Sequence, residues 1–345
     1  MTGVGIVDLM VGLTISLIAM LVILKVAILF EARRNSTVGM ADAQLNASSA
    51  MTLISRDIRM AGQGLGPPDS LGCAVDHDLS ALVAPLTLKP VEIMDGAQGE
   101  SDSILVLSSA TPQIMTPATL IADHATGDTS LMLDSTLGIQ RDHLLLLYEP
   151  SKDCSLFQAT SIPIGGYRVD HATPVRATKT AYQVGARAIN LGGMYYVRYA
   201  INDNLQLQRE RYNAADNAWS AAVMASEVVN LQAQYGFDLR PGPQASPQVT
   251  RWSSTMLNAD GSGTTGDNGD LLRLLAIRLA IVVRSVQRSD QGCHSPNPQW
   301  MAADGTTGEL KATDIIVDKT PDWACYRYRV LQTEIPLRNL LWSDS

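Results

Sequence analysis

The chain begins with an apolar run that is longer than the helices that pack inside soluble proteins. Leu9 to Phe30 reads LMVGLTISLIAMLVILKVAILF, with only Thr14, Ser16 and Lys25 as polar residues. A helix needs about 20 apolar residues to cross a bilayer, whereas a secretory signal has a basic start, a shorter apolar core and a small-residue cleavage site. Lys25 lies near the far end, where its long stem can reach the headgroups. The sequence therefore predicts one membrane-spanning helix.

The helical pattern continues beyond the apolar run. The next proline is Pro67, and glycines at 62, 64 and 66 together with Pro67-Pro68 provide a clear helix end. We expect one helix from Val4 to Ala61, with residues 4–30 in the membrane and 31–62 outside it, lying against a sheet. A coiled-coil stalk is the alternative, but the heptads are not sustained. The predicted inner face, spaced by three and four, consists of Val38, Ala41, Leu45, Ser48, Met51, Ile54, Ile58 and Ala61.

Residues 63–345 change to short runs rich in β-branched and aromatic residues, bounded by turn residues. The predicted fold class is therefore α+β: a long membrane-spanning N-terminal α-helix packed on a β-rich globular head. Asn202-Asp203-Asn204 predicts a hairpin turn, and residues 241–270 a mobile surface loop. The predicted strands are Ser103–Leu107, Ser130–Leu133, Leu144–Tyr148, Met194–Ile201, Leu205–Tyr212, Val228–Leu239, Leu272–Val283 and Tyr326–Leu337.

The strand around Leu272–Arg284 alternates in polarity. Apolar residues occupy every second position from Leu275 to Val283, and Arg278 and Arg284 lie on the opposite face. We expect one face of this strand to pack and the other to meet solvent.

Four cysteines, Cys73, Cys154, Cys293 and Cys325, contain no CxxC pair, which argues against a zinc ribbon or a thioredoxin-type centre. They fit a head in an oxidising compartment, where disulfides persist. Three connectivities are possible, and we favour Cys73 with Cys154 and Cys293 with Cys325 because both close moderate stretches of the head. Buried free thiols in a cytosolic head are the alternative.

The charge balance argues against nucleic acid as the main partner. The chain has 34 acidic and 26 basic residues and a formal charge of -8, which is the wrong sign for a polyanion binder. A local basic stripe that contacts DNA is a minor alternative, since such arginines are more often solvated or paired. Its members would be Arg273, Arg278, Arg284 and Arg288.

The sequence offers no catalytic motif and predicts no cofactor. The five histidines are dispersed, and we expect each to be a surface or locally bonded side chain; they are His77, His124, His143, His171 and His294. HExxH, GxSxG and GxxxxGK[ST] do not occur. Asp260, Asp267, Asn268 and Asp270 could offer oxygens to calcium, but their spacing is not that of an EF-hand, so a solvated loop is favoured. We expect a protein that is not an enzyme.

The first residues, Gly3-Val4-Gly5-Ile6-Val7-Asp8, resemble the processing motif of type IV prepilins, with a glycine before the cut and an acidic residue five positions after it. The resemblance implies that a prepilin peptidase removes residues 1–3, cutting between Gly3 and Val4, and methylates the new amine of Val4. It also implies that Asp8 pairs with the amine of an adjacent subunit, so that two charges that are costly in lipid compensate each other.

Several further blocks resemble the PilW-type minor pilins. They are Ile54 to Gly62, Val228 to Gly236, Leu272 to Ser285, Tyr326 to Val330 and Ile335 to Asn339. The resemblance implies a minor pilin that primes type IV pilus assembly and sits at the pilus tip, used for adhesion or twitching motility. The head would be periplasmic while the subunit is in the inner membrane, and would lie at the cell surface after assembly. The implied partners are other minor pilins, the major pilin, the prepilin peptidase, the inner-membrane assembly platform and a large tip adhesin.

Two alternatives remain open. A J-type pseudopilin of a type II secretion system shares the anchor and the tip position but serves protein export, and a calcium-loaded loop in the head would favour it. A membrane-anchored periplasmic enzyme or carbohydrate binder would need a deep polar pocket with perturbed titratable groups.

Overall fold

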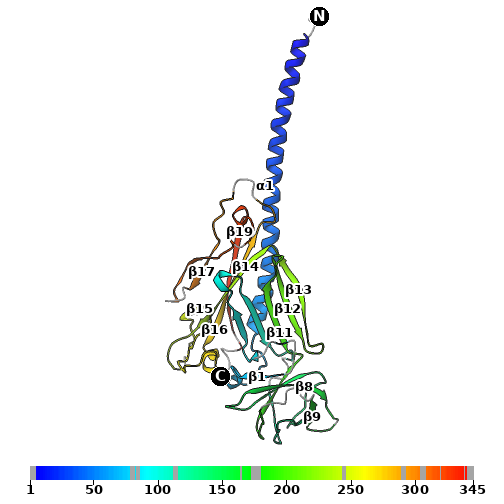
Figure 1. The fold of residues 1–345 in the computed structure, drawn as a ribbon, viewed down its shortest axis with the longest axis vertical. Coiled ribbons are helices and arrows are strands. Elements are labelled where there is room, and N and C mark those ends of the chain that lie inside the picture. The colour runs from blue at the N-terminus through cyan, green and yellow to red at the C-terminus, as the bar shows by residue number, and fades with distance from the viewer. Residues whose placement is uncertain are drawn as a thin grey trace.

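One long helix projects from a β-rich head (Figure 1). α1 runs unbroken from Ile6 to Met60, 55 residues, or about 80 Å at 1.5 Å per residue. It ends where Gly62, Gly64 and Gly66 adopt positive φ, which glycine adopts at little steric cost. The predicted helix is confirmed from Ile6 to its end. The computed structural model describes residues 5–77, 82, 86–111, 116–163, 165–171, 180–242, 246–288, 293–303, 308–318, 320–337 and 339.

The face of α1 that packs on the head differs from the predicted one in its first half. Val38 and Leu45 are 51% and 66% exposed, and Ala41 and Ser48 are also exposed, so these four positions were wrong. The buried side is instead made of small residues followed by larger ones: Ala43, Ala47, Ala50, Met51, Ile54, Ile58 and Ala61. The alanines let the helix approach the sheets closely where a leucine would hold it away.

Two sheets flank α1, which contacts the strands at their borders, β13 and β19 (Figure 1). The central sheet has the order β13-β12-β11-β4-β3, and the C-terminal sheet has the order β15-β14-β16-β19. The central strands are β3 Val91–Met94, β4 Ser103–Ser108, β11 Tyr195–Ile201, β12 Gln206–Asn213 and β13 Ala218–Ser226. The C-terminal strands are β14 Val228–Phe237, β15 Arg251–Ser253, β16 Leu274–Arg284 and β19 Tyr328–Pro336.

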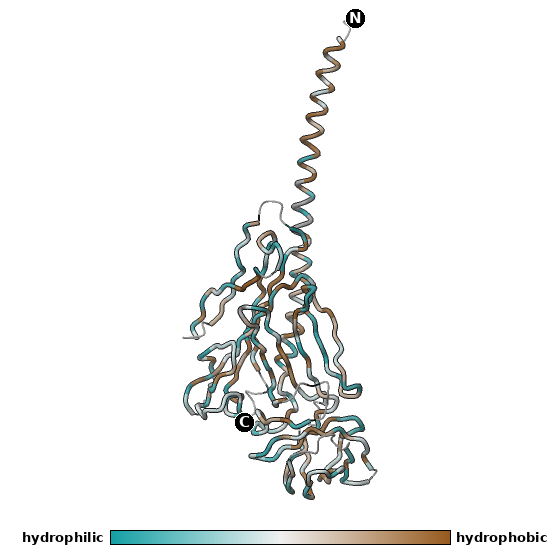
Figure 2. The backbone as a smooth tube through the Cα atoms, in the orientation of Figure 1, coloured by the Kyte–Doolittle hydropathy of each residue, from teal (hydrophilic) through white to brown (hydrophobic). Residues whose placement is uncertain are grey.

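The main core lies where α1 meets these sheets. Ile54 and Ile58 belong to one buried cluster with Tyr199, Leu231 and Ile277. Brown, hydrophobic stretches line this interior in Figure 2, and brown also follows the projecting half of α1. The head is thus assembled around the same helix that leaves it.

The expectation that β16 has a solvent face was wrong. Ten of its eleven residues are buried, including Arg278. A two-stranded hairpin of β17 Gln299–Ala303 and β18 Leu310–Asp314 covers the side away from α1, where Trp300 packs with Ala280 and Val282. The buried charge of Arg278 is tolerated there because the guanidinium donates to the carboxylate of Glu334 and lies over the ring of Trp252.

The far end of the head holds a third, eight-stranded sheet, the distal sheet, which lies opposite the projecting helix in Figure 1. Ser108 of β4 pairs with Tyr195 of β11, so residues 109–194 form an insertion between two adjacent strands. We call it the distal module. Its own core includes Leu131, Phe157 and Tyr182. The distal strands are β1 Ala74–Asp76, β2 Leu86–Thr87, β5 Ala118–Thr119, β6 Ser130–Met132, β7 Leu144–Tyr148, β8 Cys154–Ser161, β9 Arg168–His171 and β10 Arg187–Gly192.

Short helices and two disulfides complete the head. Cys73 pairs with Cys154 and Cys293 with Cys325, the connectivity favoured on sequence. The segment 241–270, in its described part, carries β15 and the start of α2; its mobility stays a prediction, as does the division of the chain at residues 3, 30 and 62. The short helices are η1 Pro68–Ser70, η2 Ala97–Gly99, α2 Asn268–Leu272 and η3 Trp323–Cys325.

All eight predicted strands are present, with ends displaced by at most two residues. The turn at Asn202 is confirmed, because its side-chain oxygen accepts hydrogen bonds from the amides of Asn204 and Gln206. Eleven further described strands were not predicted, and β8 and β13 are the longest of them. β13 reads AWSAAVMAS, and its run of alanine and serine hides a strand whose position is set by pairing with β12.

Candidate functional site

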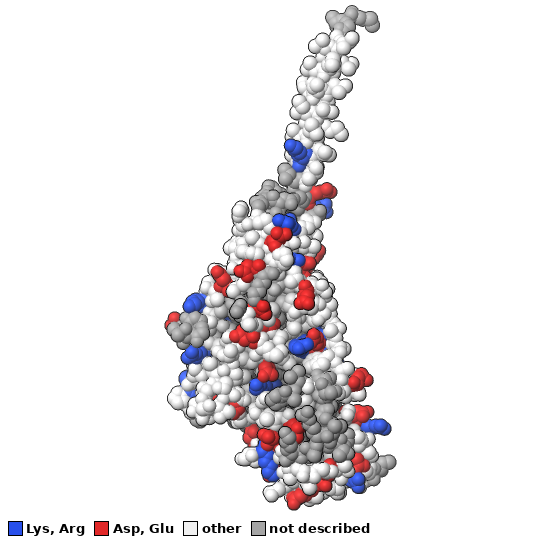
Figure 3. All heavy atoms as spheres, viewed as in Figure 1, with Lys and Arg blue, Asp and Glu red and all other residues white. Residues whose placement is uncertain are grey.

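The projecting half of α1 is the first functional feature. Leu9–Ile28 is long and apolar enough to cross a membrane, and none of it is buried against the head. Charged residues gather on the head and are nearly absent from the projecting half in Figure 3. This exposed apolar surface fits membrane anchoring. Gly3 and Val4 lie outside the described residues; Asp8 lies in the first turn of α1, and its side chain is likewise outside the described part.

Asp57 fixes the other half of α1 to the head. Its carboxylate is 4% exposed, and Oδ2 accepts hydrogen bonds from the hydroxyls of Tyr195 at 2.6 Å and Tyr199 at 2.5 Å. Arg209 Nε lies 3.6 Å from the same oxygen. Helix, β11 and β12 therefore meet at one compensated negative charge.

Burial keeps the two tyrosines of this cluster protonated. Desolvation, followed by the hydrogen bonds to Asp57, raises the pKa of Tyr195 and Tyr199, so both hydroxyls remain donors at neutral pH. These hydrogen bonds join the anchor helix to the head.

Asp57 lies in the block Ile54 to Gly62 that resembles the PilW-type minor pilins, but no role was predicted for it. A signal was present, because Asp57 shares the helix face of Ile54, Ile58 and Ala61, and a carboxylate there must find a partner. Tyr195 and Tyr199 are separated by four strand positions and therefore share one face. What the sequence could not show is that these two faces oppose each other.

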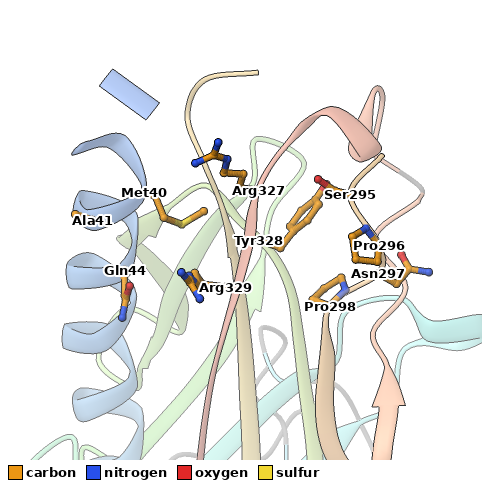
Figure 4. Close-up of a pocket in the computed structure, with 10 residues that line it drawn as sticks. All are labelled: Met40, Ala41, Gln44, Ser295, Pro296, Asn297, Pro298, Arg327, Tyr328 and Arg329. Carbon is orange, nitrogen blue, oxygen red and sulfur yellow. The ribbon is translucent and has the colours of Figure 1, made fainter. Parts of the chain in front are cut away.

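A groove runs between α1 and β19 (Figure 4). At the end nearer the membrane it forms a hollow of about 550 Å³, bordered by Met40 and Gln44 of α1, residues 295–298, and Arg327 to Arg329. In Figure 4 Arg329 points toward α1 beside Gln44. A second hollow of about 570 Å³ lies further along the same pair of elements, from Met51 to Met60 and Thr333. Both are open surface features between helix and strand.

The structure brings Asp260, Asp267 and Asp270 together, with one carboxylate oxygen of each within 4.8 Å of the others. Hydrogen bonds within the loop account for this arrangement. Asp270 is buried and accepts from the amides of Ala259, Asp260 and Gly266. Asp267 caps α2 by accepting from the Asp270 amide. Asn268, the fourth sequence candidate, instead donates to the carbonyl of Pro68.

The loop around Asp270 is closely packed. The amide of Ser262 donates to Asp260 at 2.8 Å and lowers the pKa of that carboxyl. A side chain at Gly269 would meet the Asp260 carboxylate at 2.0 Å. The carboxylates thus serve as acceptors for backbone amides, and calcium binding stays a hypothesis.

Two of the histidines predicted to be dispersed are in contact. His124 and His171 are buried, and their Nε2 atoms lie 3.1 Å apart within the distal module. Both rings pack on Phe157. Burial, and then the neighbouring His171, lower the pKa of His124. His143 is locally bonded through Nδ1 to the amide of Gln140, as expected.

The arginines of the possible basic stripe are engaged within the head. Arg278 pairs with Glu334, Arg284 with Glu227, and Arg288 with Asp322. Arg273 donates to the carbonyls of Asp238 and Arg240. These contacts neutralise the stripe or direct it inward.

Comparison with known families gives one match. The family model described as PilW, Type IV Pilus-assembly protein W, matches residues 194–339. This region begins at the return of the chain from the distal module and contains β11 to β19. The match supports a type IV pilus-related family. No curated protein and no solved structure matches the chain.

Proposed function

We propose that this protein is a minor pilin that primes assembly of a type IV pilus and stays in the complex at its tip, acting by protein–protein association. The observation that carries the proposal is a single helix that is both an exposed apolar segment and the core of the matched head. Such a helix can enter a membrane or a bundle of similar helices while Asp57 keeps the head in a fixed orientation.

The proposal includes processing at the N-terminus. Prepilin peptidase would cut between Gly3 and Val4 and methylate Val4, and Asp8 would pair with the new amine of a neighbour. A carboxylate within a span costs about 2.5 to 3.5 kcal/mol at the bilayer centre, so the pairing would both lower that cost and set the axial register.

The size of the head supports a terminal position. The distal module adds residues 109–194 at the end away from the membrane span. In a repeating lattice every copy would have to accommodate it, whereas at a tip it has free space. We place the head in the periplasm before assembly and at the pilus tip afterwards, in contact with other minor pilins, the major pilin and a tip adhesin.

Intact-mass spectrometry of the protein from its native envelope, with and without prepilin peptidase, tests the processing. The expected mature chain begins at methylated Val4 only when the peptidase is present. A Met1 start in both strains would contradict the proposal and favour an anchored enzyme or binder.

Deletion of the gene tests the assembly role and separates the two filament systems. We expect surface pili to be lost or greatly reduced, with protein export unchanged. Loss of export with normal pili would instead identify a J-type pseudopilin.

A further inference from the structure

β13 is an unusual sheet edge. Among the described strands, β13 and β19 are the edge strands with more than five residues. β19 carries Arg329, Glu334 and Pro336, which are residues that natural proteins place on an edge to prevent pairing. β13 has nine residues, AWSAAVMAS, with no charge, proline or glycine. It borders the head on the side away from β19 (Figure 1).

The strand is accessible as well as uncharged. α1 contacts β13, yet six of the nine residues of the strand stay exposed, among them Val223 at 52%. β12 is its one partner strand in the described part of the chain, so the amides and carbonyls that face away from β12 have no strand to bind. A long, neutral edge of this kind is a template for another strand.

We propose that β13 binds, by antiparallel strand addition, an uncharged edge strand of a different subunit anchored in the same membrane. The inference rests on the proposed function, because that function supplies the co-anchored neighbour. Backbone hydrogen bonds would extend the central sheet into the neighbour, and the small side chains of β13 would allow close approach.

The direction of β13 identifies the partner. Its first end follows Ala214, whose carbonyl accepts from Gln158 of the distal sheet. Its last end precedes Glu227, which pairs with Arg284 next to the segment that packs Val286 on Gly39 of α1. β13 therefore runs from the distal module toward the membrane side.

Self-pairing by a two-fold axis perpendicular to the strand is incompatible with a shared membrane. It would make the two β13 strands antiparallel, and their α1 helices would then point in opposite directions. A co-anchored neighbour must instead present a strand that runs away from the membrane. β19 shows that this architecture contains one, since it begins beside the groove at Met40 and ends at Pro336. Because β19 of this chain is charged, a different subunit with a neutral strand fits better.

The experiment compares hydrogen exchange in two samples of the full chain. One is the assembled complex extracted from the native envelope, and the other is the isolated protein in detergent micelles. We expect the outward amides of residues 218–226 to exchange at least tenfold more slowly in the complex. Equal rates would overturn the proposal, and protection of the isolated chain that grows with its own concentration would identify a second copy as the occupant.

Variants at Val223 provide the matched test. Val223→Lys and Val223→Asp place either charge on the edge, whereas Val223→Thr keeps the branched shape. We expect both charged variants to fold, with an unchanged urea midpoint, and to be at least tenfold depleted from the complex, while Val223→Thr is retained. Wild-type retention of both charged variants would refute strand addition. The two failures can be told apart. Unchanged pili after deletion of the gene would refute the proposed function, whereas retention of the charged Val223 variants in the complex would refute strand addition alone.

Discussion

A charged residue in the interior of a helix–sheet interface is tolerated because its partners are already in place. Asp57 is almost fully buried, yet Tyr195, Tyr199 and Arg209 approach its Oδ2 and Arg56 lies 3.4 Å from its Oδ1. Removal of one member of such a cluster costs more than the cluster itself contributes, because the remaining groups are left buried without a partner.

Asp57→Ala should therefore lower the free energy of unfolding by about 3 kcal/mol, since two phenols lose their acceptor and Arg209 loses its ion-pair partner. Urea denaturation of the full chain in detergent micelles measures this. The control is Asp42→Ala, an exposed carboxylate on the same helix, which should change the value by less than about 0.5 kcal/mol. Equal effects of the two substitutions would show that the cluster contributes nothing specific.

The His124–His171 contact makes the distal module sensitive to acid. The pKa of His124 is below 6.5 in the folded chain because of burial and then His171, whereas the unfolded chain keeps a value near 6.5. Protonation therefore favours the unfolded state. The stability contributed by neutral His124 is complete above pH 6.5 and is lost progressively as the pH falls from that value to the lower pKa of the folded chain.

We expect the urea midpoint to fall between pH 7.5 and pH 5, and the fall to be smaller in His124→Gln. His294→Gln, at an exposed position, should retain the wild-type pH dependence. If His124→Gln showed the full dependence as well, other groups would be responsible for it.

At the scale of elements, α1 joins two different environments in one unbroken helix. Its buried side in the head is made of alanine near the membrane and of larger residues further along. The small residues let the helix approach β13 and β19, the two border strands among those that it contacts. Leu45, which the spacing placed inside, faces outward and is available to neighbours.

Ala47 and Leu45 test this assignment of faces. Ala47→Leu should destabilise the head by about 1 to 3 kcal/mol, because the side chain has no exposed surface and the extra atoms must displace the sheet. Leu45→Ala should be nearly neutral, at under about 0.5 kcal/mol. Thermal or urea unfolding of both variants provides the comparison. A larger loss of stability for Leu45→Ala than for Ala47→Leu would support the face predicted from spacing.

At the scale of the molecule, the head is one body extended by an insertion. The distal module leaves β4 and returns to β11, and the distal sheet adds β1, which pairs with β8 across the disulfide Cys73–Cys154. The disulfide joins residues 81 positions apart. It therefore links the insertion to the segment that follows α1, and it restricts the unfolded chain strongly.

Replacing both Cys73 and Cys154 with serine should lower the free energy of unfolding by about 4.5 kcal/mol by the loop-entropy relation. The same change at Cys293 and Cys325, only 32 positions apart, should cost somewhat less, provided the folded geometry is unaffected. Urea midpoints of both double variants, with the oxidised wild type as reference, measure the order. A larger loss for the shorter loop would show that native contacts, and not chain entropy, dominate.

The sequence by itself determined the features that depend on local pattern. The length of the apolar run, the unbroken helix to Met60, its glycine and proline stop, and eight strands follow from periodicity and turn residues. The favoured cysteine pairs were also those formed. The helix and the strands are encoded within a few neighbouring residues, whereas the cysteine pairs join residues 81 and 32 positions apart.

Only the tertiary structure decided which surfaces meet. Asp57 opposes Tyr195 and Tyr199 across about 140 residues of chain, the hairpin of β17 and β18 covers the face of β16 that was expected to meet solvent, and His124 reaches His171. β13 became a strand because β12 offered it a partner, although its own residues favour no strand strongly. Side-chain pattern fixes the shape of an element, but burial, compensation of charge and edge pairing depend on what the rest of the chain places against it.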